Sequence, residues 1–136
     1  MGDDSGRYEM KKELYIYENL NPQQKHVGDC VVRAMAYFFG VDWRTAFYSL
    51  IVYCADHAVV TFNYRSTYGS FLAEKGYRKM KVPEKGMTVA KFRDEFAEQG
   101  RTYMVQVPRH LTIIDDRVLI DTWDCSDRKV EGYWIK

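Results

Sequence analysis

The sequence lacks the features that mark several common classes of protein. Its three cysteines include no CxxC pair, and the cysteines and histidines lack zinc-ligand spacing, so we expect reduced thiols, no metal and no cofactor. No hydrophobic run approaches the length of a membrane-spanning helix, and residues 1–10 are too polar for a signal peptide. These absences predict a cytoplasmic protein that does not bind membranes.

The sequence also lacks an excess of charge of either sign. The formal net charge is +1, and the acidic and basic residues are interspersed. Because binding to nucleic acid relies on a clustered basic face, we expect no nucleic-acid partner. The basic residues between Arg78 and Lys85 are more typical of a solvated edge, so a nucleic-acid binder is the weakest interpretation.

Hydrophobic residues make up 46% of the sequence, which is enough to build one core. We therefore expect a single domain over residues 1–136, in which residues 1–11 form a flexible lead-in. Helical periodicity and capping residues predict helices at residues 29–40, 42–55, 66–75 and 88–100. Alternating patterns predict strands at residues 102–107, 111–114, 118–122 and 133–136, and residues 14–17 form a strand or an extended arm. Helices followed by antiparallel strands predict an α+β fold.

Cys30 lies in the first turn of the first predicted helix, directly after Asp29, a residue type that favours the N-cap position. The helix dipole and free backbone N–H groups there lower a thiol pKa from about 8.5 by one to several units. Such a thiolate is a nucleophile at neutral pH. The alternative interpretation is a small buried residue near a helix start.

His110 begins a predicted strand, and a two-residue turn at Asp115 and Asp116 would place it directly opposite Asp121. Residues paired in this way have Cα atoms about 4.5–5.5 Å apart, so Asp121 would orient the imidazole. If the register slips, Asp124 takes that role. The alternative is an ordinary histidine at a strand end. The same register puts a hydrophobic stripe on the other face: Leu111, Ile113, Val118 and Ile120.

Gln24 lies six residues before Cys30. Its side-chain amide, together with the backbone N–H of Cys30, is a candidate donor to the oxyanion that forms when a thiolate attacks a carbonyl. The alternative is an exposed loop glutamine.

These residues occur in the order and local context of a known family: Gln24, Cys30, His110 and Asp121. In papain-like cysteine peptidases a glutamine lies six residues before the nucleophile, which opens a long helix. Their histidine begins a later strand, and an Asn or Asp ends the next one. The chain resembles this family over residues 23–40 and 103–136. The resemblance implies a papain-like domain in which the helix carrying Cys30 packs on a C-terminal antiparallel sheet.

Two segments extend the resemblance. Asp121-Thr122-Trp123 is similar to the run in papain-like enzymes where a tryptophan shields the histidine contact from water, which implies that role for Trp123. Residues 24–40 resemble the leader-processing peptidase domains of bacteriocin exporters, which show Gln, four residues, Asp-Cys, and a helix that ends in two aromatic residues and glycine.

The resemblance implies a cysteine peptidase or isopeptidase that cleaves an amide bond of a peptide or protein substrate, in a bacterium or a phage-infected cell. An Asp in the third position leaves open an acyltransferase or a transglutaminase-like enzyme. The short chain lacks much of the substrate cleft of the larger family members. It therefore leaves open a catalytically inactive binding protein of a phage or a bacterium.

Overall fold

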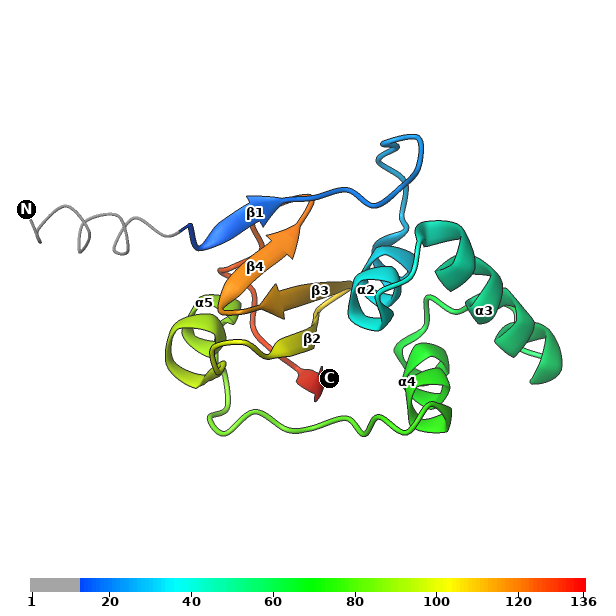
Figure 1. The fold of residues 1–136 in the computed structure, drawn as a ribbon. Coiled ribbons are helices and arrows are strands. Elements are labelled where there is room, and N and C mark those ends of the chain that lie inside the picture. Colours follow the sequence, from blue (N-terminus) through cyan, green and yellow to red (C-terminus); the bar gives the residue numbers. More distant parts are fainter. Residues whose placement is uncertain (1–12) are drawn as a thin grey trace, which may run out of the picture.

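The computed structural model describes residues 13–136; the predicted flexible lead-in, residues 1–11, lies outside the described residues. The α+β class is confirmed, with four helices and a five-stranded sheet in the described part of the chain (Figure 1). The elements are β1 (Tyr15–Tyr17), α2 (Cys30–Phe39), α3 (Trp43–Asp56), α4 (Arg65–Glu74), α5 (Val89–Lys91), the π-helical turn η1 (Phe92–Phe96), β2 (Thr102–Val107), β3 (His110–Asp115), β4 (Val118–Asp121) and β5 (Gly132–Ile135).

The sheet is mixed, which corrects the prediction of a purely antiparallel sheet. Its strand order is β1-β4-β3-β2-β5, and the four C-terminal strands pair in antiparallel fashion. The short β1 runs parallel to β4, with Tyr15 opposite Leu119. A parallel pair requires a long crossover connection, and the helices between β1 and β4 provide it. The added strand covers an edge of β4 that would otherwise expose unpaired backbone groups.

The helix ends follow the capping residues that the sequence offers. Gly40 takes the left-handed conformation, with φ 67°, and ends α2. The Asp42 carboxylate accepts a hydrogen bond from the Thr45 N–H at 2.8 Å and so caps α3. The helix predicted at residues 88–100 is shorter than expected. After α5 the backbone widens into η1, where the Ala97 N–H donates to the Phe92 carbonyl at 2.7 Å.

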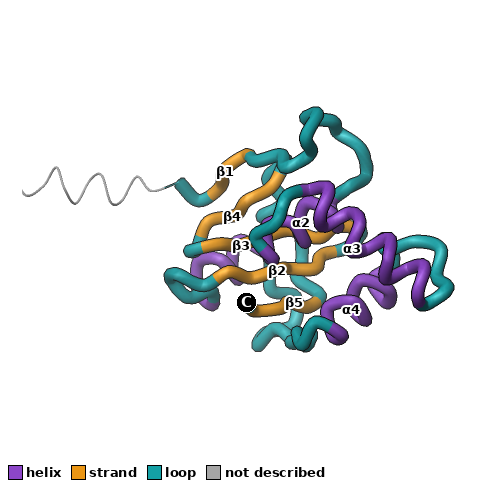
Figure 2. The backbone as a smooth tube through the Cα atoms, turned by 45° about the vertical axis from the view of Figure 1, so that its right-hand side comes forward, coloured by secondary structure: helices purple, strands orange, loops and turns teal. Residues whose placement is uncertain are grey.

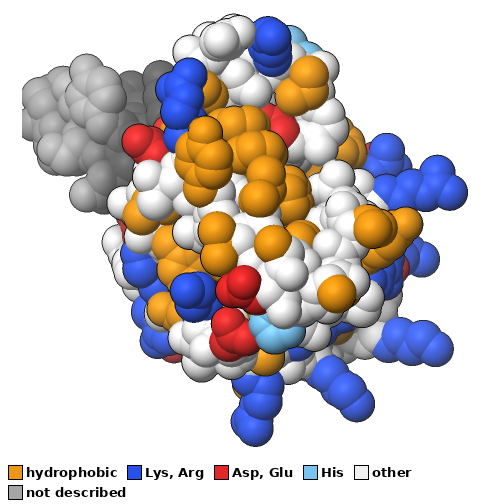
Figure 3. Space-filling model, turned by 90° about the vertical axis from the view of Figure 1, so that its right-hand side faces the viewer, with side chains coloured by type: hydrophobic (Ala, Val, Ile, Leu, Met, Phe, Trp, Pro, Cys, Tyr) orange, Lys and Arg blue, Asp and Glu red, His pale blue; other side chains and the backbone are white. Residues whose placement is uncertain are grey.

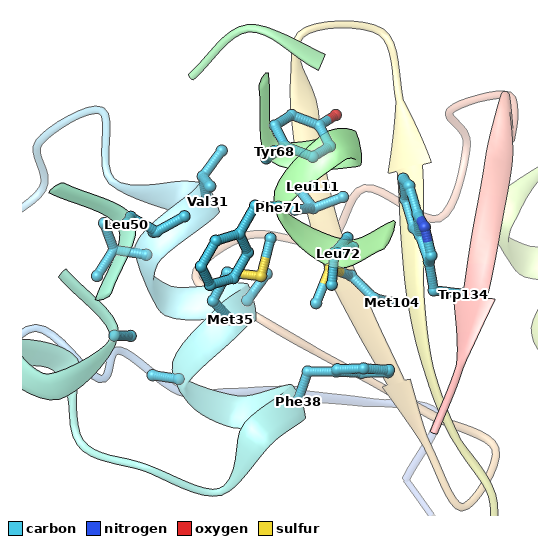
Figure 4. Packing of buried hydrophobic residues seen from close by; sticks show 14 of the residues in the cluster. Val31, Met35, Phe38, Leu50, Tyr68, Phe71, Leu72, Met104, Leu111 and Trp134 are labelled. Carbon is cyan, nitrogen blue, oxygen red and sulfur yellow. The ribbon is translucent and has the colours of Figure 1, made fainter. Parts of the chain in front are cut away.

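Helices α2, α3 and α4 cover one face of the sheet, and α5 with η1 lies on the other (Figures 1 and 2). Figure 4 shows the packing on the first face, where side chains of α2–α4 meet those of three strands: Met104, Leu111 and Trp134. A second cluster joins the other face to α5 and η1. Because both faces are covered, β2 is buried continuously from Tyr103 to Val107 rather than at alternate residues.

The outer side of α3 carries exposed hydrophobic side chains, Tyr48 at 62% and Val52 at 55% of their full exposure. Figure 3 shows this side of the molecule, where hydrophobic side chains reach the surface and lysines and arginines project from the edges.

With 14 residues, α3 is the longest described helix. No helix in residues 13–136 is long and apolar enough to cross a lipid bilayer.

The β3–β4 hairpin is shifted by two residues from the predicted register. The turn consists of Asp116 and Arg117, with φ 52° and 63°, rather than Asp115 and Asp116. Positive φ at both turn residues is the type I′ pattern, which matches the twist of the paired strands. Asp115 lies within β3 and accepts hydrogen bonds from Tyr37 and Thr102. Since side chains alternate with period two, a two-residue shift keeps each one on its predicted face.

Candidate active site

Cys30 is the first residue of α2 and lies partly buried against the start of β3. Burial opposes ionisation of the thiol, but a hydrogen bond with His110 and the charge of that imidazole outweigh it. A backbone hydrogen bond from Leu111 and the charge of Arg33 act in the same direction. The pKa of Cys30 is therefore lowered from its usual value.

His110 and Asp121 form a short, buried contact. The Nε2 atom of His110 lies 2.6 Å from Oδ2 of Asp121, and the two side chains are only 9% and 4% exposed. Burial disfavours the charged forms, but hydrogen bonds with Asp121, Cys125 and Cys30 raise the pKa of His110 to about 11. Burial likewise opposes ionisation of Asp121, yet the hydrogen bond with His110 lowers the pKa of the carboxyl group. An imidazolium facing a thiolate and a carboxylate is the arrangement that these directions favour.

The two residues meet diagonally rather than directly across the hairpin. His110 begins β3 and Asp121 ends β4, and the observed register pairs Ile113 with Ile120. Extending it places Asp121 two residues from the position opposite His110, and diagonal neighbours remain within reach of long side chains. The contact of Nε2 with Asp121 leaves Nδ1 of His110 for Cys30.

Asp124, the alternative third member, does not occupy this position. Its side chain is exposed and accepts a hydrogen bond from the backbone N–H of Ser126 at 3.0 Å. Asp121 is also held by its neighbours, since Oδ1 accepts from the Thr122 N–H at 2.6 Å. The structure therefore places Asp121, and not Asp124, beside the imidazole.

Trp123 lies against His110, with ring centroids 5.0 Å apart and planes tilted by 52°. Trp123 is 38% exposed, and its ring also lies 5.4 Å from the guanidinium carbon of Arg128. The indole thus lies close to the imidazole on the solvent side. This placement is the one that a shielding role for Trp123 requires, and the role itself stays a prediction.

Gln24 is not brought to Cys30. It is exposed, and its Nε2 donates to the carbonyls of Asn19 at 2.9 Å and Asn21 at 3.2 Å. Both amide hydrogens are thereby used within the loop that precedes α2. As described, Gln24 orders this loop and offers no donor to an oxyanion beside Cys30. A glutamine six residues before a helix start can either order the loop or donate to an oxyanion. The spacing in the sequence therefore does not distinguish these two roles.

Asp29 connects three segments of the chain, a role that was not predicted from the sequence. Its side chain makes no capping hydrogen bond to α2, contrary to the prediction from its type and position. The buried carboxylate accepts instead from Asn21 Nδ2 at 3.1 Å and Trp43 Nε1 at 2.9 Å, and lies 3.1 Å from Nε of Arg33. These contacts tie the preceding loop, α2 and α3 together. No side chain in residues 13–136 caps the first N–H groups of α2, beginning with that of Cys30, so they are available to bind an anion.

One group of described residues has donors suited to a metal ion: His110, Asp121 and Cys125, whose ligand atoms lie within 4.8 Å of one another. Tetrahedral zinc with bonds of about 2.0–2.1 Å holds nitrogen and oxygen ligands roughly 3.3 Å apart. The 2.6 Å between His110 and Asp121 fits a shared proton instead. The Cys125 thiol donates to Oδ2 of Asp121 at 3.7 Å and so supports the carboxylate.

A pocket of about 380 Å³ opens beside Cys30 and His110. It is lined by the start of α2, the loop and first turns of α4, and the turn between β2 and β3. Its volume lies within the usual range for a site that binds a small molecule or a short peptide segment. The contribution of α4 to this site was not predicted, because its residues match no known motif.

The raised pKa of His110 predicts a particular dependence of stability on pH. A group whose pKa is higher in the folded state contributes stability that is fully present below its unfolded value, 6.5, and is lost as the pH rises toward 11. We expect the stability difference between Cys30→Ala and Cys30→Ala/His110→Gln to shrink by about 1–3 kcal/mol between pH 6 and pH 9. The alanine background removes the titration of the thiol itself, and urea unfolding at each pH gives the difference.

The matched control is His57→Gln, which removes an exposed histidine that pairs with Glu74 outside the site. If the difference in unfolding free energy between Cys30→Ala and Cys30→Ala/His110→Gln stays constant from pH 6 to pH 9, His110 is not held as an imidazolium in the folded protein.

Comparisons with protein-family models, curated proteins and solved structures found no match. The function is therefore inferred from the side chains around Cys30 and from their geometry.

Proposed function

We propose that the protein is a papain-like cysteine hydrolase that breaks an amide bond of a peptide or protein substrate. The observation that carries the proposal is the buried 2.6 Å contact between His110 and Asp121 beside Cys30 at a helix start. A nucleophile, a base and a group that orients the base are the three parts that acyl transfer by a thiol requires. The lowered pKa of Cys30 and the raised pKa of His110 support the same roles.

In the proposed first step the thiolate of Cys30 attacks the carbonyl carbon of the amide. A carbon–sulfur bond forms, and the carbonyl oxygen becomes an oxyanion. The N–H groups at the start of α2 are free to stabilise this charge, since Asp29 does not cap them.

Collapse of this intermediate breaks the carbon–nitrogen bond, and the leaving amine takes the proton from Nδ1 of His110. Formation of the thioester removes the negative sulfur that raises the pKa of His110, so the imidazolium becomes a better acid when the amine needs a proton. Neutral His110, oriented by Asp121, then takes a proton from water. The resulting hydroxide equivalent attacks the thioester, the carbon–sulfur bond breaks, and the thiolate returns.

The proposal is tested by incubating the protein with a mixture of tryptic peptides, with and without millimolar glycinamide. Mass spectrometry should find new peptide termini and, in brief reactions, an acyl mass on the Cys30 peptide. Products that carry glycinamide would identify the acyltransferase alternative, since an amine then replaces water. An unchanged mixture with no acyl mass would contradict both and favour a catalytically inactive binding protein.

A further inference from the structure

The charged side chains that line the pocket beside Cys30 are positive. None of its lining residues is acidic, and two are arginines, Arg65 and Arg109. Arg65 forms an ion pair with Glu131 at 2.9 Å, which offsets part of its charge. Lys79 lies close enough for Arg65 to help lower its pKa, after the effect of burial. The lining of the pocket that holds the reacting sulfur therefore carries excess positive charge.

Arg109 occupies a position that does not suit an arginine. Pro108 and Arg109 form the two-residue turn between β2 and β3, since Val107 pairs with His110. Proline fixes a negative φ at the first turn position, and Arg109 follows with φ 58°. This sequence of angles is the type II pattern, whose second central position is normally glycine because a side chain there is strained. Strained residues of this kind cluster at active sites and ligand clamps, which makes Arg109 a candidate for such a role.

The other strained arginine of the sheet makes the contrast clear. Arg117, with φ 63° in the β3–β4 turn, donates hydrogen bonds to the carbonyls of Arg93 and Asp94. The guanidinium of Arg109 has no hydrogen bond or ion pair with any residue in 13–136, and it is exposed at the pocket. Arg117 thus has a partner within the chain, whereas Arg109 has none among the described residues.

We propose that Arg109 selects substrates with a carboxylate next to the amide bond that Cys30 attacks. The proposal rests on the proposed function and adds the class of substrate: the carboxylate is either an acidic side chain on the acyl residue or the free C-terminal carboxylate of the residue that leaves as the amine. Guanidinium groups bind carboxylates through two parallel hydrogen bonds, and Arg109 directly precedes His110. Arg109 lines the same pocket as Cys30 and His110, so a carboxylate that it binds would lie in that pocket.

The first test compares alkylation of Cys30 by iodoacetate, which is anionic, and by iodoacetamide, its neutral counterpart. Both reagents form a carbon–sulfur bond and release iodide, so their rate ratio reports the charge around the sulfur. At low ionic strength Arg109→Gly should reduce the iodoacetate-to-iodoacetamide ratio by about three- to tenfold. Arg109→Lys should largely retain it. Arg117→Gly removes the same charge from the opposite end of β3 and should change the ratio less than twofold.

The second test distinguishes the two sources of the carboxylate. N-acetylglutamic acid α-amide carries only a side-chain carboxylate, N-acetylglutamine only a terminal one, and N-acetylglutamine amide none. One of the first two should protect Cys30 of the wild type from iodoacetamide, and neither should protect Arg109→Gly. Equal protection by the neutral amide, or a reagent ratio that is indifferent to Arg109, would overturn this inference.

The outcomes separate this inference from the function on which it rests. Rapid reaction of Cys30 at pH 6 with no effect of Arg109 would leave the proposed hydrolase intact and remove only the acidic substrate. A Cys30 that is inert at pH 6 would overturn both. Arg109→Gly should also fold at least as well as the wild type, because glycine relieves the strained φ, so a loss of selectivity cannot be attributed to unfolding.

Discussion

Replacing Cys30 with alanine should abolish amide cleavage, with a loss of at least about 10³-fold in rate, while the protein stays folded. The described residues offer no substitute nucleophile at the pocket. Cys125 is fully buried, and burial raises the pKa of Cys54, which lies on α3 away from the pocket. The measurement is the yield of new peptide termini from the tryptic mixture, with folding checked by circular dichroism.

Cys54→Ala is the matched control, since it also removes a mostly buried thiol from a helix of the same layer. We expect its cleavage rate to equal that of the wild type. Cleavage that survives Cys30→Ala but not Cys54→Ala would place the nucleophile elsewhere and contradict the site.

Asp121→Ala should have the second largest effect, on both stability and reactivity. Removing one partner of a buried ion pair costs about 3–5 kcal/mol, because the remaining imidazolium is left buried without its counterion. Without Asp121 the imidazole also loses its orientation and much of its basicity, which should reduce cleavage by about 10²–10⁴-fold. Urea unfolding and the peptide assay measure the two effects separately.

Asp124→Ala removes an exposed carboxylate three residues away, which among the described residues is bound only to the Ser126 N–H. We expect it to leave stability and cleavage close to those of the wild type. Asp121→Asn keeps a hydrogen-bonding group of the same shape and should retain more activity than Asp121→Ala. The opposite ranking, with Asp124→Ala the more damaging, would show that the observed register does not hold in solution.

The sequence predicted most of the elements because their ends carry local signals. Gly40 ends α2, and Asp42 caps α3, as their residue types indicate. Residues 14–17 were predicted as a strand or an extended arm, but the parallel pairing of β1 with β4 was not predicted, and neither was the π-helical turn η1. Both depend on what packs beside them. The three-residue strand β1 forms because the edge of β4 is free to pair with it, and no residue within β1 specifies that partner.

The candidate site could be predicted even though the register was wrong. His110 and Asp121 remain on one face after a shift of two residues, and a diagonal pair can still form a hydrogen bond. A shift of one residue would have separated them. The roles predicted for Asp29 as an N-cap and for Gln24 as an oxyanion donor rested on sequence position alone. Their hydrogen bonds depend on Asn21 in the same loop and on Trp43, which the fold brings to this loop from α3.

The thiolate–imidazolium pair is tested most directly by the rate of Cys30 alkylation by iodoacetamide between pH 5 and pH 9, followed on the Cys30 peptide by mass spectrometry. With a thiolate–imidazolium pair, the wild type should react rapidly at pH 6, where an ordinary thiol with a pKa of about 8.5 is less than about 1% ionised. In His110→Ala the rate at pH 6 should fall by at least about tenfold, and His57→Ala should behave like the wild type. A wild-type profile that follows an ordinary thiol, or one that does not respond to His110→Ala, would contradict the catalytic site.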